Sequence, residues 1–134
     1  MDNNSLIEKA IEARKNAYAP YSQHRVGAVV VTDKGALYTG CNIENCAFLG
    51  ECAERVAIYK ALSEGAKKIV KLVVVTANKE LSAPCGICRQ VIREFNPKIE
   101  IVIANTDKKF KVLTLEELLP HSFGPESFRQ GQGS

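Results

Sequence analysis

Two short segments decide the fold of this chain: Cys52-Ala53-Glu54 and Pro84-Cys85-Gly86-Ile87-Cys88. Together they supply three thiols and one carboxylate. Zinc binds cysteine thiolates readily, and a catalytic zinc has three protein ligands and an open fourth position for water. A carboxylate that is not itself a ligand can take and return the protons of that water. The two segments therefore predict one zinc per chain, held by Cys52, Cys85 and Cys88, with Glu54 as the proton carrier.

Each segment lies where a helix is expected to begin. Residues 52–62 and residues 85–95 have helical spacing, and Gly65 and Pro97 follow them. The N-terminus of a helix has unpaired N–H groups and a partial positive charge, which favour thiolates. The two helix starts are therefore expected to meet at the metal.

The charge of such a site has to be balanced. Three thiolates give zinc an excess negative charge, which opposes the loss of a proton from water. We expect Arg55 or Arg89 to offset this charge by donating hydrogen bonds to the sulfur atoms, because such outer contacts tune a bound metal.

The Cys85–Cys88 pair considered alone is more typical of a structural zinc knuckle or a redox dithiol. A redox pair would explain neither Cys52 nor Glu54. A structural site needs a fourth ligand, for which Cys41 and Cys46 are available, but a closed site would leave Glu54 without a task. Cys41 and Cys46 are more typical of small buried apolar residues.

The rest of the sequence predicts the element order α-β-β-α-β-α-β-β-α. Ser5 begins a capping-box pattern, and the helical spacing that follows it ends at Pro20. A last short helix is expected after Thr114 and before Pro120. A mixed sheet with helices on both faces fits this order. The expected strands are residues 26–32, 36–43, 69–76, 99–103 and 109–113.

The composition is that of an ordinary globular protein: 46% of the residues are hydrophobic and 25% are charged. A length of 134 residues fits a single domain over residues 1–134. The net charge is only +3. The lysine cluster at residues 67–71 contains no aromatic residue, and the one at residues 108–111 contains Phe110 alone rather than a series of interleaved aromatics. We interpret both clusters as solvated faces and expect no nucleic-acid partner.

We find no pattern in the sequence that is typical of a membrane span or a signal peptide. No run of about 18 apolar residues occurs, so we expect no membrane span, and the first residues lack the basic and apolar regions of a signal peptide. The chain has five cysteines, three of them at metal-binding spacing. A reducing, cytoplasmic setting fits this better than a disulfide framework.

The metal segments, extended by Arg55 and by Arg89-Gln90, closely resemble those of the small, homotetrameric, three-cysteine zinc cytidine deaminases, part of the cytidine/deoxycytidylate deaminase superfamily. The resemblance covers roughly residues 5–128. It includes four further stretches, at residues 21–28, 40–45, 118–120 and 122–126.

The resemblance implies a three-layer α/β/α sandwich with a five-stranded mixed sheet. It implies hydrolytic deamination of cytidine and deoxycytidine to uridine and deoxyuridine, with release of ammonia, as in pyrimidine salvage. Cys52, Cys85 and Cys88 would hold Zn²⁺. Glu54 would take a proton from the zinc-bound water, deliver it to ring N3 and later protonate the leaving amine.

The resemblance also implies contacts with a nucleoside substrate. Asn42 and Glu44 would hydrogen-bond the ribose 3′-hydroxyl, while His24 and Ala53 would line the pocket. A carboxylate at this place would oppose a phosphate by charge repulsion. Asn42 alone is equally typical of a turn, and its pairing with Glu44 favours a binding role.

Three residues are implied to reach the pocket from neighbouring subunits of a homotetramer: Cys46, Phe48 and Phe123. Without the resemblance, Phe123 would be interpreted as core packing.

The sequence departs from the family pattern in three places. His24 replaces a usual Phe, Phe48 replaces a common Tyr, and the segment between Glu44 and Cys52 is one residue shorter. His also stands at this position in some blasticidin S deaminases, which share the zinc motifs. Another cytosine nucleoside such as blasticidin S is therefore an alternative substrate. A non-catalytic zinc scaffold and a nucleic-acid editor are further alternatives, opposed by Glu54 and by the charge of Glu44 respectively.

Overall fold

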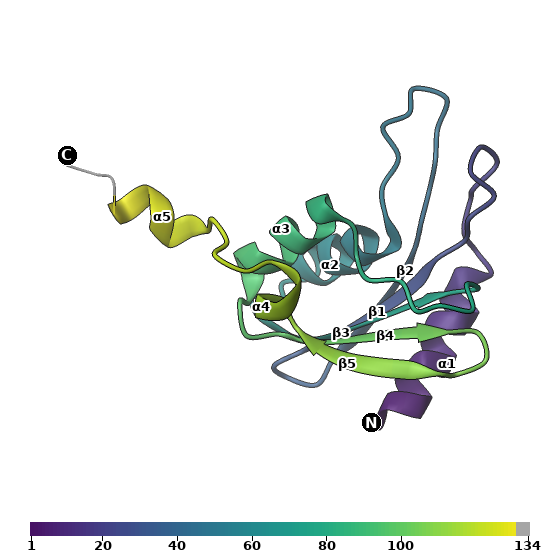
Figure 1. Cartoon of the computed structure of the whole chain (residues 1–134), viewed down its shortest axis with the longest axis horizontal. Helices are drawn as coiled ribbons and strands as arrows, with labels where there is room; N and C mark the ends of the chain where they lie inside the picture. Colours follow the sequence, from purple (N-terminus) through teal and green to yellow (C-terminus); the bar gives the residue numbers. More distant parts are fainter. Residues whose placement is uncertain (131–134) are drawn as a thin grey trace.

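The structure is a computed structural model that describes residues 1–130 (Figure 1). Its centre is a five-stranded sheet with the strand order β2-β1-β3-β4-β5. β3 and β4 are parallel, and the other neighbouring pairs are antiparallel. The expected five-stranded mixed sheet is therefore confirmed. The strands are β1 (Gly27–Thr32), β2 (Leu37–Cys41), β3 (Ile69–Thr76), β4 (Glu100–Asn105) and β5 (Phe110–Thr114).

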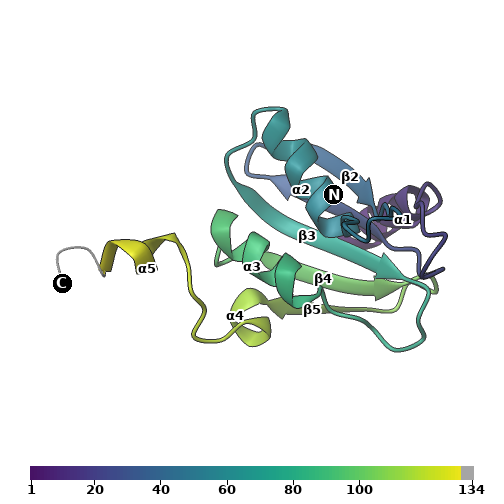
Figure 2. The same cartoon turned by 90° about the horizontal axis from the view of Figure 1, so that it is seen from above.

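Helices cover both faces of the sheet, which gives the three expected layers. Helix α1 (Asn3–Arg14) packs on one face, and α2 (Ala53–Ser63) and α3 (Gly86–Phe95) pack on the other (Figures 1 and 2). Val73 and Val75 belong to the apolar cluster under α1, whereas Leu72 and Val74 belong to the cluster under α2 and α3. Because successive side chains of a strand point to opposite faces, both faces of β3 are apolar.

Two glycines allow the helices to lie close to the sheet. A Cβ atom added at Gly27 would lie 2.0 Å from the carbonyl oxygen of Ala10 in α1. One added at Gly40 would lie 2.5 Å from the backbone nitrogen of Ala57 in α2. The close approach of α2 to β2 fixes the position of the residues at the start of α2.

The helices differ from the expectation in three places. The helical spacing was expected to continue to Pro20, but α1 ends at Arg14. The capping box predicted at Ser5 is wrong: Asp2 caps α1 by accepting a hydrogen bond from the Ser5 N–H at 2.8 Å, so the helix begins earlier. At the other end of the chain, α5 (Pro125–Gln130) was not predicted. The short helix expected after Thr114 is confirmed: it is α4 (Leu115–Leu118), and Thr114 begins it with a capping box.

Charged side chains at the surface are partly paired. Lys71 forms an ion pair with Glu100 at 2.8 Å, and Lys108 forms one with Glu8 at 2.6 Å. Within residues 1–130, no helix is both long and apolar enough to cross a membrane.

Candidate metal centre and active-site cavity

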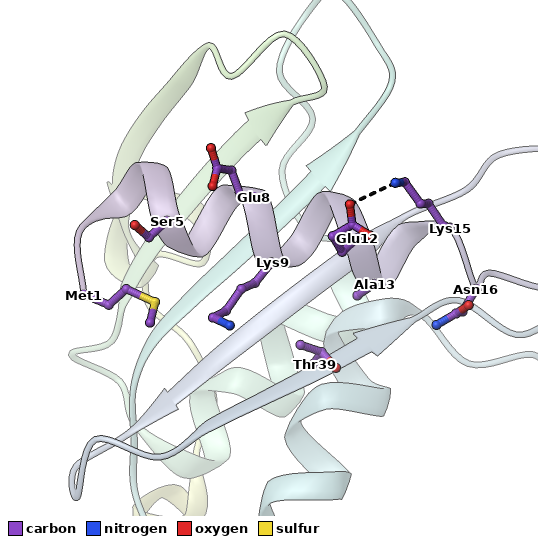
Figure 3. A pocket seen from close by; sticks show the side chains of 9 residues that line it. All are labelled: Met1, Ser5, Glu8, Lys9, Glu12, Ala13, Lys15, Asn16 and Thr39. Atoms are coloured by element: carbon purple, nitrogen blue, oxygen red, sulfur yellow. Dashed lines mark hydrogen bonds and ion pairs between the residues drawn. The ribbon is translucent and has the colours of Figure 1, made fainter.

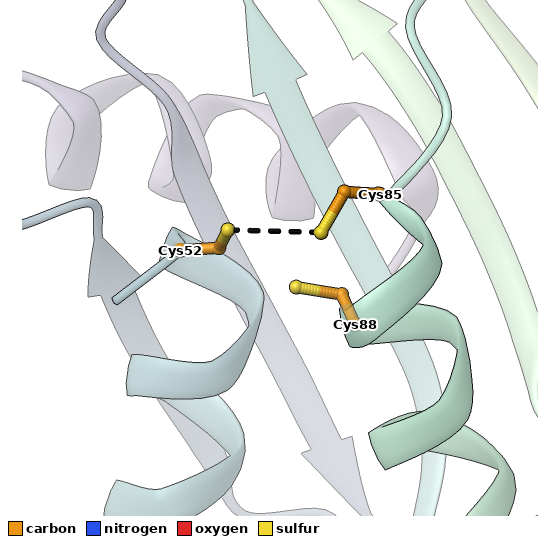
Figure 4. Close-up of side chains that lie close together, drawn as sticks. All are labelled: Cys52, Cys85 and Cys88. Carbon is orange, nitrogen blue, oxygen red and sulfur yellow. Dashed lines mark hydrogen bonds between the residues drawn. The ribbon is translucent and has the colours of Figure 1, made fainter. Parts of the chain in front are cut away.

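Three thiols converge where α2 and α3 begin (Figure 4). Cys52 and Cys85 are the N-cap residues of these helices, and Cys88 lies buried in the first turn of α3. Neither N-cap thiol makes a capping hydrogen bond, so both are free to point toward a shared centre.

The spacing of the thiols fits zinc. Their Sγ atoms all lie within 4.8 Å of one another, and those of Cys52 and Cys85 are 3.9 Å apart. Two thiolates on a tetrahedral zinc, at bond lengths of about 2.3 Å, lie about 3.8 Å apart. Among residues 1–130, neither Cys41 nor Cys46 joins the group. The group thus offers three thiol ligands, which is the number of protein ligands that a catalytic zinc has.

Arg55 supplies the expected positive charge next to the sulfurs. Its Nη2 donates a hydrogen bond to Cys52 Sγ at 3.4 Å. Its Nε lies 3.3 Å from Glu51 Oε2, close enough for an ion pair but without hydrogen-bond geometry. The guanidinium is thereby held between a carboxylate and a thiol.

Arg89 does not make the expected contact with sulfur. Its Nε donates to the carbonyl oxygen of Pro84 and its Nη1 to that of Leu118, both at 2.7 Å. The side chain thus ties the segment before Cys85 to α4. Its effect on the thiols is positional, because both of its hydrogen bonds go to backbone carbonyls and neither goes to sulfur.

The thiols of the metal-free chain already share their protons unequally. Hydrogen bonding with Cys88, helped by Arg55, lowers the pKa of Cys52 to about 5. The same hydrogen bond, together with burial, raises the pKa of Cys88. The hydrogen bond from Arg55 therefore favours the thiolate form of Cys52.

Glu54 is a buried carboxyl group beside this cluster. It is the second residue of α2 and is 5% exposed. Burial, with a smaller contribution from the Cys52 thiolate, raises the pKa of Glu54 to about 7 in the metal-free chain. A group with a pKa near the working pH can both accept and donate a proton, which suits a general acid–base role.

A cavity of about 250 Å³ joins these groups to the predicted substrate residues. Cys52, Cys85 and Glu54 line one part of it. All four substrate residues predicted within the same chain line it as well: His24, Asn42, Glu44 and Ala53. The structure therefore brings together residues that lie far apart in the sequence.

The cavity wall also contains residues that the sequence analysis missed. Thr76 comes from the end of β3, and Ser82 and Ala83 come from the segment that leads to Cys85. The place of Ser82 and Ala83 just before Pro84 was a usable signal. Ser22 was noted only as part of a motif, and it also lines the cavity.

Asn42 and Glu44 are tied to the loop opposite them. The Asn42 side chain accepts a hydrogen bond from the Val26 N–H at 2.8 Å and donates one to the His24 carbonyl at 2.7 Å. The Glu44 carboxylate accepts from the N–H groups of Tyr21 and Ser22 at 3.0 and 3.1 Å. Both side chains therefore have fixed orientations at the cavity wall.

The three residues assigned to neighbouring subunits lie outside the cavity of their own chain. Cys46 and Phe48 are on the long loop between β2 and α2, and Phe123 is on the segment that leads away to α5 (Figure 1). All three are exposed, Phe48 by 79% and Phe123 by 54%. The interpretation of Cys46 as a buried residue is therefore wrong. Phe48 contacts Tyr21 edge-on, with ring centroids 5.5 Å apart.

A larger hollow of about 680 Å³ lies on the other side of the sheet, between α1 and β2 (Figure 3). Its wall consists mainly of solvated side chains of α1, among them the ion pair between Lys15 and Glu12 at 2.9 Å. It contains none of the candidate metal-binding, catalytic or substrate-binding residues. The cavity at the thiols is therefore the candidate active site.

Comparison with known proteins agrees with this site. The family described as "Cytidine and deoxycytidylate deaminase zinc-binding region" matches residues 1–105. The cytidine deaminase of Halalkalibacterium halodurans is 42% identical over 128 residues, covering 94% of this chain and 97% of the relative. That of Sporosarcina psychrophila is 41% identical over 128 residues, covering 94% of each.

A solved structure shows the same fold. The crystal structure of cytidine deaminase from Burkholderia pseudomallei superposes with a TM-score of 0.88 at 42% sequence identity. The match covers 92% of this chain and 100% of that one. With a three-thiol zinc site, a buried glutamate and relatives matched over nearly their full length, the chain belongs to the zinc-dependent cytidine and deoxycytidylate deaminase family.

Proposed function

We propose that this protein catalyses the hydrolytic deamination of cytidine and deoxycytidine to uridine and deoxyuridine, with release of ammonia. The observation that carries the proposal is a single cavity lined by Cys52, Cys85 and Glu54 at one part and by Asn42 and Glu44 at another. The first set suits hydrolysis of an aminopyrimidine, and the second suits a sugar hydroxyl. The names of the relatives support the same substrate class.

The chemistry is divided between the metal and Glu54. Zinc held by the three thiolates supplies Lewis acidity and an activated water. Glu54 takes a proton from the attacking water, delivers it to ring N3 and then protonates the leaving amine. Burial raises the pKa of its carboxyl group into the range in which it can both accept and donate a proton. Arg55 limits the excess negative charge on the sulfurs through its bond to Cys52.

Asn42 and Glu44 form the proposed site for the sugar. A carboxylate accepts hydrogen bonds from hydroxyls and repels phosphates, so the enzyme takes nucleosides and rejects nucleotides. Hydrogen bonds from Ser22 lower the pKa of Glu44, which keeps this carboxyl charged. His24 and Ala53 complete the wall near the base.

The working enzyme is proposed to be a homotetramer. Phe48, Leu49 and Phe123 are large apolar side chains exposed by 79%, 77% and 54%, and they lie on segments that project from the body of the chain (Figure 1). Contact with other copies would bury them and would bring Phe48, Cys46 and Phe123 to neighbouring cavities. A cytoplasmic location suits the protein, because its zinc ligands must stay reduced.

An ultraviolet assay of the purified protein tests the proposal. The substrates are cytidine, deoxycytidine, CMP, cytosine and blasticidin S, and the zinc content is measured in parallel. We expect turnover of the first two nucleosides and little of CMP or cytosine. Turnover of blasticidin S with none of cytidine would replace the proposed substrate. CMP turnover as fast as that of cytidine would remove the role assigned to Glu44.

A further inference from the structure

Ser22 stands between the proposed sugar contact and the base end of the cavity. Its hydroxyl donates a hydrogen bond to the second oxygen of the Glu44 carboxylate. The same Ser22 Oγ accepts a hydrogen bond from the His24 N–H at 3.0 Å. One hydroxyl thus links the Glu44 side chain to the backbone of the residue that lines the base pocket.

The hydrogen bonds of Glu44 leave a defined capacity for a ligand. A carboxylate offers about four acceptor positions. The Tyr21 N–H and the Ser22 N–H use Oε1, and the Ser22 hydroxyl uses Oε2. About one position, on Oε2, is then left for a further donor, and the Ser22 hydroxyl determines which one it is.

Asn42 has the complementary capacity. Its side-chain amide uses one N–H on the His24 carbonyl and accepts from the Val26 N–H. One N–H of the amide is left as a donor. A single sugar hydroxyl, which donates one hydrogen bond and accepts others, can therefore donate to Glu44 and accept from Asn42.

The place of Ser22 in the cavity walls agrees with such a role. Ser22 and Glu44 both line the 250 Å³ cavity, and both also line an adjoining hollow of about 230 Å³ next to Tyr21 and Phe48. The pair forms part of the partition between the two spaces. A rotation of the Glu44 carboxylate would change the wall of both.

We propose that Ser22 is a positioning residue that sets the orientation of the Glu44 carboxylate, so that one acceptor faces one sugar hydroxyl of the substrate. This inference rests on the proposed nucleoside deaminase function. Ser22 acts through Glu44, and its effect should therefore depend on the presence of the hydroxyl that Glu44 binds.

The test combines variants of the enzyme with a change in the substrate. KM and kcat are measured for wild type, Ser22→Ala and Ser22→Thr with cytidine and with 3′-deoxycytidine. With cytidine, we expect Ser22→Ala to raise KM by about 3- to 10-fold, the range of one hydrogen bond, with a much smaller change in kcat. With 3′-deoxycytidine, Ser22→Ala and wild type should have the same KM. Ser22→Thr keeps the hydroxyl and should restore most of the loss.

The second substrate separates this role from general loosening of the loop, and Ser63→Ala controls for the loss of a serine hydroxyl as such. Ser63→Ala removes an exposed hydroxyl at the far end of α2, bonded only to the Lys60 carbonyl, and should behave as wild type. An equal rise in KM on both substrates, or no rescue by Ser22→Thr, overturns the inference alone. Absence of cytidine turnover by wild type overturns the proposed function and this inference with it.

Discussion

The guanidinium of Arg55 donates a hydrogen bond to the sulfur of Cys52 across 3.4 Å, one helical turn along α2. Within residues 1–130, Arg55 is the cationic side chain that hydrogen-bonds to one of the three clustered thiols. Replacing Arg55 by Gln should therefore raise the pKa of Cys52 and weaken zinc binding by about 10- to 100-fold, the usual effect of losing an outer contact. Arg55→Lys, which keeps the charge without the planar fork, should fall between the two. Competition with a chromophoric chelator measures the affinities, and equal affinity in Arg55→Gln and wild type would contradict the assigned role.

The three-thiol site predicts a clear difference between cysteines. Cys88→Ser should lose the bound zinc and the activity, because the cavity would retain only two thiolates. Cys46→Ser is the matched control, since Cys46 is exposed and lies outside the thiol group, and it should keep about one zinc per chain. Elemental analysis of the purified variants gives the answer. Full zinc retention and activity in Cys88→Ser would refute the site.

Glu54→Gln should keep the fold and the zinc and lose nearly all turnover. A positioned acid–base group contributes about 10²- to 10⁴-fold to a rate, and Glu54 is assigned several transfers. Glu80→Gln, a change at an exposed position, serves as the control. The measurement is kcat on cytidine with zinc content determined on the same samples. A Glu54→Gln enzyme with a rate close to that of wild type would show that another group moves the protons.

The burial of Glu54 also predicts a dependence of stability on pH. Its pKa is raised from 4.5 to about 7 in the folded metal-free chain, so between these values the folded state binds more protons than the unfolded state. The stability associated with this group is therefore full below pH 4.5 and is lost as the pH rises toward 7. Glu54→Gln should exceed wild type in stability at pH 8, by up to a few kcal/mol at ~1.4 kcal/mol per pKa unit, and match it near pH 4. Urea unfolding in the presence of a chelator checks this, and the same stability gap at both pH values would argue against it.

Mixing two inactive variants tests the shared sites of the homotetramer. Phe123→Ala should be impaired because the neighbouring cavity lacks its ring, and Glu54→Gln because its own cavity lacks the proton carrier. When the two are co-expressed, some sites receive Glu54 from one subunit and Phe123 from the other, so up to about a quarter of wild-type activity should return on random mixing. Light scattering confirms the assembly. An active monomer, or a mixture no better than its parts, would show that each chain has a complete site of its own.

The sequence was sufficient to predict features that depend on local residue patterns or on the ligand preferences of zinc. The strand at Ile69–Thr76 was predicted at its observed bounds, because six of its eight residues are β-branched and such residues favour strands. The thiols and Glu54 were found because zinc restricts ligand type and spacing. The bond from Ser22 to Glu44 was not, since it depends on how two loops meet in space. The Asp2 cap was missed because a second pattern at Ser5 competed with it.

The position of β5 at one edge of the sheet has a consequence for solubility. An edge strand presents unpaired backbone groups that can template aggregation, and proteins commonly guard such edges with lysine. Lys109 and Lys111 are both exposed here, and Lys111 separates Phe110 from Val112, which are 42% and 43% exposed. Replacing Lys111 by a β-branched apolar residue would leave four consecutive apolar side chains on a free edge. Lys111 thus acts as a gatekeeper against intermolecular strand pairing, and variants made for expression should retain it.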